Sequence, residues 1–137
     1  MTISYNKLGS NGRLGNQMFQ YASLRGIANY NQYQWMIPPP DYNHKDNYGL
    51  FDTFEMKHVK PENLGFNDAM TVKEKTHAFD DSLFYCTDGV NIDAYLQTED
   101  YFVHIADQIR EDFTFKKDFL EPCQEFISSL GSSPIFI

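Results

Sequence analysis

The first forty residues alternate between apolar segments and turn-forming residues in an order that predicts a strand, a helix and a second strand. Thr2 to Leu8 is typical of a strand, and a glycine-rich turn follows it. Gln17 to Tyr30 is expected to be a helix because its apolar residues recur every three or four positions, and Asn16 is suited to cap it. Gln34 to Ile37 is expected to be the second strand. This β-loop-α-β opening predicts an α/β fold.

The proline run at Pro38–Pro40 ends that second strand, since proline cannot continue a strand ladder. The stretch from Asp41 to Asp88 shows only short apolar islands, of which Leu83–Cys86 is compatible with a short strand. The sequence shows no internal repeat, and no low-complexity tract other than the three prolines. This middle third therefore predicts less than the two ends of the chain.

The last third again shows clear periodicity. Asn91 to Gln97 is expected to be extended, and Thr98 to cap a helix with two acidic residues in its first turn. Asp118 is expected to cap a final helix that stops at Gly131. The apolar faces of these two helices are predicted to be Tyr101, Phe102, Ile105, Ala106 and Ile109, and Phe119, Cys123, Phe126, Ile127 and Leu130. Ile135–Ile137 resembles the first half of a buried parallel strand, so we expect a domain that is incomplete at its C-terminus.

The composition indicates one globular domain and disfavours nucleic acid as a partner. The chain has 137 residues, 42% of them hydrophobic, and a net charge of −8 that would repel a phosphate backbone. Its two cysteines have no metal-ligand spacing, which favours free thiols in a reducing compartment. Apolar runs are far shorter than the roughly 20 residues of a membrane span. We therefore expect a cytoplasmic chain without a membrane span.

The loop from Gly9 to Gln17 carries the strongest chemical signal. Three glycines at three-residue steps link a predicted strand to a predicted helix, which allows backbone N–H groups to approach an anion. The spacing is neither that of the dinucleotide fingerprint nor that of a P-loop, so a purely structural turn is an equal alternative. Arg13 favours a phosphate ligand, although a solvated surface arginine is the other interpretation.

Two blocks of the sequence are similar to those of a known family. The run Gly12-Arg13-Leu14-Gly15-Asn16-Gln17-Met18-Phe19-Gln20-Tyr21-Ala22 resembles the N-terminal signature of the family 11 glycosyltransferases, the α-1,2-fucosyltransferases. The segment Asn91–Lys116 is similar to the family's second block, with Leu96 standing where an aromatic residue is usual. The order and rough spacing of the blocks also fit, and the middle of the chain matches loosely.

The resemblance implies a fold, a reaction and a set of site residues. Residues 1–137 would form a single Rossmann-like three-layer domain, the acceptor-side N-terminal half of a GT-B-type fucosyltransferase, without its donor-binding domain. Such an enzyme transfers fucose from GDP-fucose to a galactoside and needs neither metal nor cofactor. The implied donor- and acceptor-binding residues are Gly12, Arg13, Gly15, Asn16 and Gln17, with Gln97 and Tyr101 as weaker candidates. No catalytic residue is assigned.

Three readings of the function remain open. The first is an enzyme fragment. In the family, a His-x-Arg-Arg-x-Asp motif follows and binds the pyrophosphate of the donor. This sequence reaches Ile137 without that motif, so we expect that the chain alone does not transfer fucose. A non-catalytic sugar- or nucleotide-binding module is the second reading, and a remnant that dimerises through its exposed C-terminal strand is the third. Gln97 and Tyr101 also have a purely structural interpretation, in which they belong to a helix cap and to the hydrophobic core instead of binding a ligand. A Rossmann dehydrogenase is disfavoured because prolines, not an acidic residue, follow Ile37.

Overall fold

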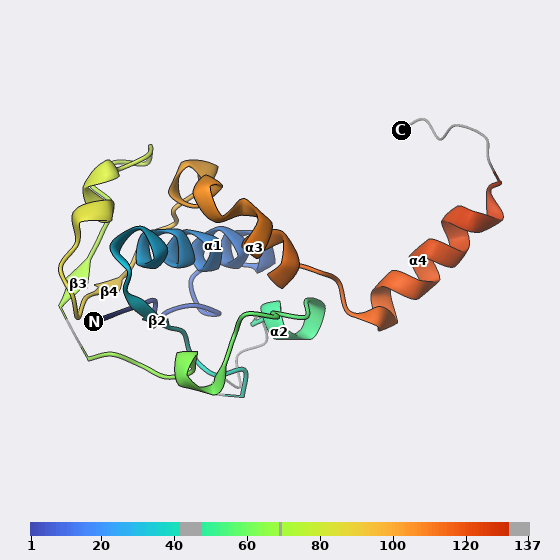
Figure 1. The fold of residues 1–137 in the computed structure, drawn as a ribbon, viewed down its shortest axis with the longest axis horizontal. Helices are drawn as coiled ribbons and strands as arrows, with labels where there is room; N and C mark the ends of the chain where they lie inside the picture. The colour runs from blue at the N-terminus through green and yellow to red at the C-terminus, as the bar shows by residue number, and fades with distance from the viewer. Residues whose placement is uncertain (42–47, 69, 132–137) are drawn as a thin grey trace.

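The chain folds around a small parallel β-sheet, which confirms the predicted α/β character. The computed structural model describes residues 1–41, 48–68 and 70–131. The strands are β1 (Thr2–Ser4), β2 (Gln34–Met36), β3 (Thr71–Val72) and β4 (Asn91–Ile92), and they lie in the order β2-β1-β4-β3 (Figure 1). Strand β1 is shorter than the expected Thr2–Leu8, because the chain turns at Tyr5, whose carbonyl accepts a hydrogen bond from the Leu8 amide.

The two central strands are covered on both faces. Successive side chains of a strand point to opposite faces, and Ile3 and Ser4 of β1 are both fully buried. Asn91 and Ile92 of β4 are likewise both buried. A short parallel sheet that is buried on both faces places its functional groups at the strand ends, where loops emerge.

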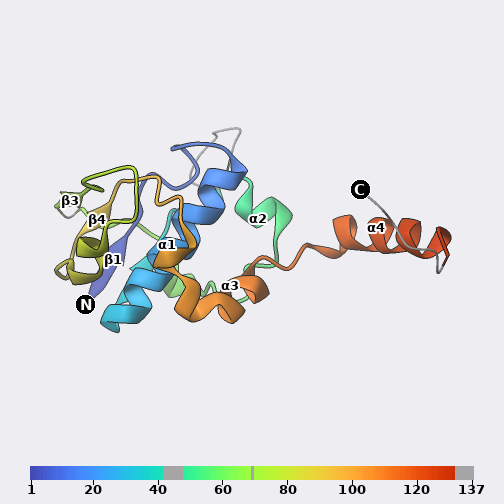
Figure 2. The ribbon, with the colours of Figure 1, turned by 90° about the horizontal axis from the view of Figure 1, so that it is seen from above.

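Helix α1 (Leu14–Asn31) lies against the sheet, and ten of its 18 residues are buried. Every residue from Gln20 to Ala28 is buried, so the helix is covered nearly all round and not only on one apolar face (Figure 2). Two members of the predicted apolar face, Phe19 and Tyr30, are in fact exposed. The helix also begins earlier than predicted: Arg13 occupies the N-cap position and Asn16 lies in the first turn.

Short helical segments replace the expected strand in the middle of the chain. Helix α2 (Leu50–Thr53) and the 3₁₀ helices η1 (Pro61–Asn63) and η2 (Asp81–Tyr85) precede β4. The strand proposed for Leu83–Cys86 is therefore wrong. Part of the cause is local: the Asp80 carboxylate accepts hydrogen bonds from the amide and hydroxyl of Ser82, which starts a turn where a strand would need an extended backbone.

The helix predicted after Thr98 is present but divided. Two 3₁₀ helices, η3 (Glu99–Tyr101) and η4 (Val103–Ile105), lead into α3 (Ala106–Asp112). Thr98 caps the segment as predicted, since its hydroxyl accepts a hydrogen bond from the Asp100 amide at 3.3 Å. The segment lies close against α1 because residue 26 is a glycine: a Cβ there would lie 1.9 Å from the Tyr101 carbonyl oxygen.

Helix α4 (Lys117–Ser129) extends away from the rest of the chain in both views (Figures 1 and 2). Its N-cap is Lys116, two residues before the predicted cap at Asp118, and none of its residues is buried. Phe119, Phe126 and Ile127 of the predicted apolar face are each more than half exposed. The predicted strand Ile135–Ile137, and with it a dimer formed through that strand, lies outside the described residues.

Candidate functional site

The glycine-rich loop leaves the carboxyl end of β1 and runs into the N-terminus of α1. Two of its glycines, Gly9 and Gly12, have positive φ angles of 90° and 106°, which residues with a side chain rarely adopt. At Gly12 there is also no space, because a Cβ would lie 2.4 Å from the side-chain nitrogen of Asn16. The loop therefore needs glycine at this position for both conformation and packing.

Two buried glutamines of α1 hold the loop from beneath. The Gln17 side chain donates to the Gly12 carbonyl at 3.1 Å and accepts from the Gly49 amide at 3.1 Å. The Gln20 side chain donates to the Asn11 carbonyl at 2.6 Å. Both glutamines are fully buried. Gln17, predicted to bind a ligand, is thus placed to shape the loop rather than to contact a ligand directly.

The outer surface of the loop brings together four of the predicted site residues. Arg13 is exposed, and its guanidinium makes no hydrogen bond or ion pair within the described part of the chain. Asn16 accepts a hydrogen bond of 2.7 Å from the Gln97 side chain, which comes from the segment after β4. Gly15, exposed beside them in the first turn, has no atom within 4 Å of the position where a Cβ would lie. These groups and the helix N-terminus present donors and positive charge on one surface.

Tyr101, the other weaker candidate, belongs to the core. It is fully buried, its hydroxyl donates to the Glu74 carboxylate at 2.9 Å and accepts from the Asp80 amide at 2.8 Å. Burial is the main cause that raises its pKa well above the usual range for tyrosine, so the hydroxyl stays protonated at neutral pH. Tyr101 therefore fixes the segment after β3 against η3, which agrees with the core alternative left open by the sequence.

A pocket of about 320 Å³ opens at the carboxyl ends of β1, β4 and β3, beside the glycine-rich loop. We call it the strand-end pocket; its lining residues are Asn11, Lys73, Glu74, Lys75, Thr76, His77, Asp93, Ala94 and Tyr95. Ligands of open α/β sheets bind in this position. Sequence analysis named none of these residues as a binding residue, although Asn11 lies in the glycine-rich loop and Asp93–Tyr95 in the second family block. For the residues after β3 the signal is their position after a strand, and β3 and β4 are too short, at two residues each, to be predicted.

Tyr5 joins the strand-end pocket to the glycine-rich loop. Its buried hydroxyl donates a short hydrogen bond to the Ala94 carbonyl and accepts one of 3.0 Å from the Asn11 side chain. Burial raises the pKa of this phenol far above the usual range for tyrosine, so it serves as a fixed neutral donor. The loop after β1 and the loop after β4 are thereby held at a fixed distance.

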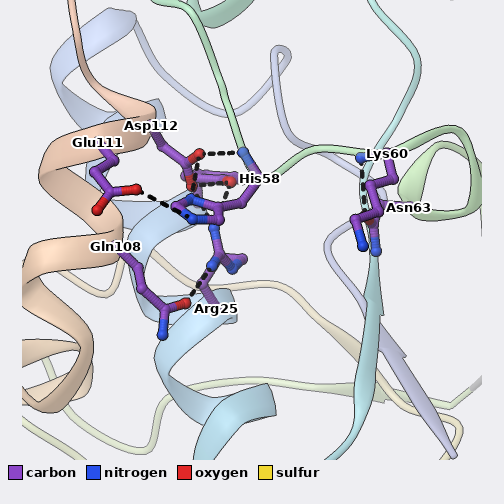
Figure 3. Close-up of polar contacts among 8 residues, drawn as sticks. Arg25, His58, Lys60, Asn63, Gln108, Glu111 and Asp112 are labelled. Atoms are coloured by element: carbon purple, nitrogen blue, oxygen red, sulfur yellow. Dashed lines mark hydrogen bonds and ion pairs between the residues drawn. The ribbon is translucent and has the colours of Figure 1, made fainter.

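A second polar cluster lies along the middle of α1, around a buried ion pair. The Arg25 guanidinium makes a short contact with the Asp112 carboxylate of α3, and the Tyr21 hydroxyl donates to the same carboxylate at 2.6 Å. His58 approaches from the segment after α2, with its backbone amide 2.7 Å from Asp112 and its Nδ1 3.0 Å away (Figure 3). Arg25 and Asp112 are both buried.

Further contacts tie the cluster to α3. The second terminal nitrogen of Arg25 donates to Gln108 at 2.9 Å, and His58 Nε2 lies 3.3 Å from Glu111 (Figure 3). The imidazole is thus engaged on both nitrogens, and the guanidinium donates to Asp112, Tyr21 and Gln108 and lies over the Trp35 ring. We infer that the cluster holds α1, α3 and the segment around His58 together.

Neither a metal site nor a membrane span emerges from residues 1–41, 48–68 and 70–131. No group of three or more His, Cys, Asp or Glu side chains in these ranges could hold a metal ion. None of the helices that they form is long and apolar enough to cross a membrane. Comparison with known proteins adds no assignment: no family model, no curated protein and no solved structure matches this chain.

Proposed function

We propose that this chain is the acceptor-side half of a fucosyltransferase-like glycosyltransferase, a Rossmann-like unit whose glycine-rich loop faces GDP-fucose and a galactoside acceptor. The observation that carries the proposal is the 2.7 Å hydrogen bond between Gln97 and Asn16. Each residue belongs to one of the two sequence blocks that resemble family 11 glycosyltransferases. Blocks separated by 81 positions in the sequence meet at one surface, as parts of a single site would.

The donor end of this site is proposed to lie at Arg13 and the N-terminus of α1. Fucose transfer with inversion builds negative charge on the departing GDP, which a guanidinium and free helix N–H groups would stabilise. Arg13 is exposed and has no competing partner among the described residues. Gly15 leaves open space beside it, while Asn16 and Gln97 offer amide groups to sugar hydroxyls.

We expect this chain to bind ligands without transferring fucose by itself. The sequence has three arginines, Arg13, Arg25 and Arg110, and no His-x-Arg-Arg-x-Asp motif. Of the three, Arg25 already forms a buried ion pair with Asp112 and is therefore not available to a ligand. One guanidinium at the loop would leave most of the diphosphate charge without a partner. The alternative function, a non-catalytic sugar- or nucleotide-binding module, predicts the same binding. It differs only in that such a module has no catalytic partner domain.

The test is a calorimetric titration of the chain with GDP-fucose. We expect saturable binding that weakens by about 10-fold in Arg13→Ala, the loss of one charge-assisted hydrogen bond. Arg110→Ala is the matched control, because Arg110 is exposed on α3, where it pairs with Asp107. A flat titration up to millimolar GDP-fucose, or equal weakening by both variants, would contradict the proposal. Fucose transfer to a galactoside by this chain alone would contradict the expected inactivity.

A further inference from the structure

The strand-end pocket has the lining of a site for a neutral, hydroxyl-rich ligand. Its two lysines, Lys73 and Lys75, are balanced by two carboxylates, Glu74 and Asp93, so its formal charge is zero with His77 neutral. A phosphate entering the pocket would meet both carboxylates in a chain that is already strongly acidic. Sugar hydroxyls both donate and accept hydrogen bonds, and an interspersed set of donors and acceptors suits them.

Both carboxylates are held in place by hydrogen bonds, and each can still accept further hydrogen bonds from a ligand. Glu74 accepts from the Tyr101 hydroxyl at 2.9 Å and from the Leu96 amide at 3.3 Å, one bond on each oxygen. Asp93 accepts from Lys7 at 2.7 Å through Oδ2, and its Oδ1 has no hydrogen-bond partner in the described part of the chain. A carboxylate has about four lone-pair sites, so each of these can still accept a hydroxyl.

An aromatic ring and an amide complete the lining. Tyr95 lies in the loop after β4 and leaves 48% of its surface exposed at the pocket. An exposed ring offers an apolar face to the C–H surface of a sugar, while its hydroxyl stays in water. Asn11 contributes its side-chain oxygen, because its nitrogen already donates to Tyr5. A volume of about 320 Å³ lies at the lower end of the roughly 300–1,000 Å³ of ligand clefts.

We propose that the strand-end pocket binds a neutral saccharide ring, with Asp93 and Glu74 accepting from its hydroxyls and Tyr95 against its C–H face. The inference rests on the proposed function for the identity of the sugar, a galactoside, and deepens it by naming the residues that receive the acceptor. Because Tyr5 fixes the pocket to the glycine-rich loop, a sugar bound there lies next to the proposed donor surface.

Ligand-observed NMR with methyl β-galactoside tests the pocket directly. We expect saturable binding to the full chain, weakened about 10-fold or more by Tyr95→Ala and by Asp93→Asn. Tyr85→Ala is the matched control: Tyr85 is 72% exposed, lies on η2 and is not part of the pocket, so its loss should change the affinity by less than about twofold. Two pocket variants are used because a folding defect in one would not explain loss in both.

The outcomes separate this inference from the proposed function. Galactoside binding that is insensitive to both pocket variants, or displaced by inorganic phosphate, would overturn the pocket assignment. If GDP-fucose binding still depends on Arg13 in that case, the proposed function survives and only the acceptor location is wrong. If the galactoside binds through Tyr95 and Asp93 while GDP-fucose does not bind at all, the pocket is correct and the chain is a sugar-binding module. Methyl β-glucoside in parallel reports whether the pocket selects galactose.

Discussion

At the scale of single residues, Gly12 decides the shape of the loop. Replacing it with alanine places a Cβ at φ 106° and 2.4 Å from the Asn16 side chain. We expect Gly12→Ala to lower the free energy of unfolding by about 1–3 kcal/mol and to displace Asn16 from Gln97. Urea denaturation followed by the fluorescence of Trp35, the single tryptophan, measures the first effect, and GDP-fucose titration the second.

Gly15→Ala is the matched control for Gly12→Ala. Gly15 lies in the first turn of α1, and its added Cβ would meet nothing within 4 Å. Alanine is favoured over glycine in a helix by roughly 0.5–1 kcal/mol, so Gly15→Ala should be neutral or stabilising. Equal stability of the two alanine variants would show that the loop relaxes freely, and the argument for a fixed loop would be wrong.

The sequence located this loop but not the roles of its residues. Arg13 is exposed and Asn16 is partly exposed on its outer side, and their role in ligand binding stays a prediction. Gln17 is adjacent in sequence yet faces inward, where it binds backbone groups of Gly12 and Gly49. Whether a residue at the start of a helix faces ligand or core depends on what packs beneath it. That packing comes from the segment at Gly49, which sequence periodicity does not place.

At the scale of elements, the buried ion pair between Arg25 and Asp112 holds α3 to α1. Asp112→Ala would leave the Arg25 guanidinium buried without its carboxylate, and it would remove acceptors for Tyr21 and His58. We expect a loss of about 3–5 kcal/mol in the free energy of unfolding, the usual cost of an uncompensated buried charge. Urea denaturation monitored at Trp35, which stacks on Arg25, measures it.

Asp107→Ala provides the control for this ion pair on the same helix. Asp107 pairs with Arg110 at 3.1 Å, but both side chains are largely exposed. Exposed pairs contribute about 0–1 kcal/mol, so this variant should unfold close to the parent chain. If Asp112→Ala were no less stable than Asp107→Ala, α3 would not be fastened through this cluster.

Elements were predictable where local sequence alone determines them. Helices α1 and α4 follow the helical period, and Thr98 caps as its sequence context suggests. The turn at Asp81–Tyr85 and the division of the helix after Thr98 depend on tertiary contacts. Asp80 is tied to Lys75 and Tyr101, and the chain at Tyr101 lies against Gly26 of α1. Such contacts override the intrinsic preference of a short apolar run.

At the scale of the whole molecule, the order of the strands determines where the candidate site lies, but this order could not be predicted from the sequence. The β1-α1-β2 unit was predicted because its parts are neighbours in sequence. The pairing of β1 with β4 joins Ser4 to Asn91 across most of the chain, and β3 joins the sheet through Thr71 and Val72. Because these strands are so short, only the assembled sheet brings the loops after β1, β3 and β4 to one edge and forms the strand-end pocket.

The remaining question at this scale is whether α4 belongs to the folded body. Its 13 residues have no buried member, whereas the segment before it is fixed: the Lys116 amide donates to Thr53 and the Glu55 amide donates to Thr114. A helix of this length is marginal in water without packing. We therefore expect deletion of residues 117–137 to change the free energy of unfolding of the body by less than about 0.5 kcal/mol.

Urea denaturation at Trp35 tests the deletion, with Phe54→Ala as the contrasting variant. Phe54 is buried and packs on Phe113 and Phe115, so its truncation to alanine should cost about 3–5 kcal/mol. Far-UV circular dichroism of the deleted and full-length chains reports in the same samples how much helix residues 117–129 form. A deletion that costs as much as Phe54→Ala would mean that α4 packs against the body in solution. In that case Phe119, Phe126 and Ile127 would be core residues, as their spacing in the sequence first indicates.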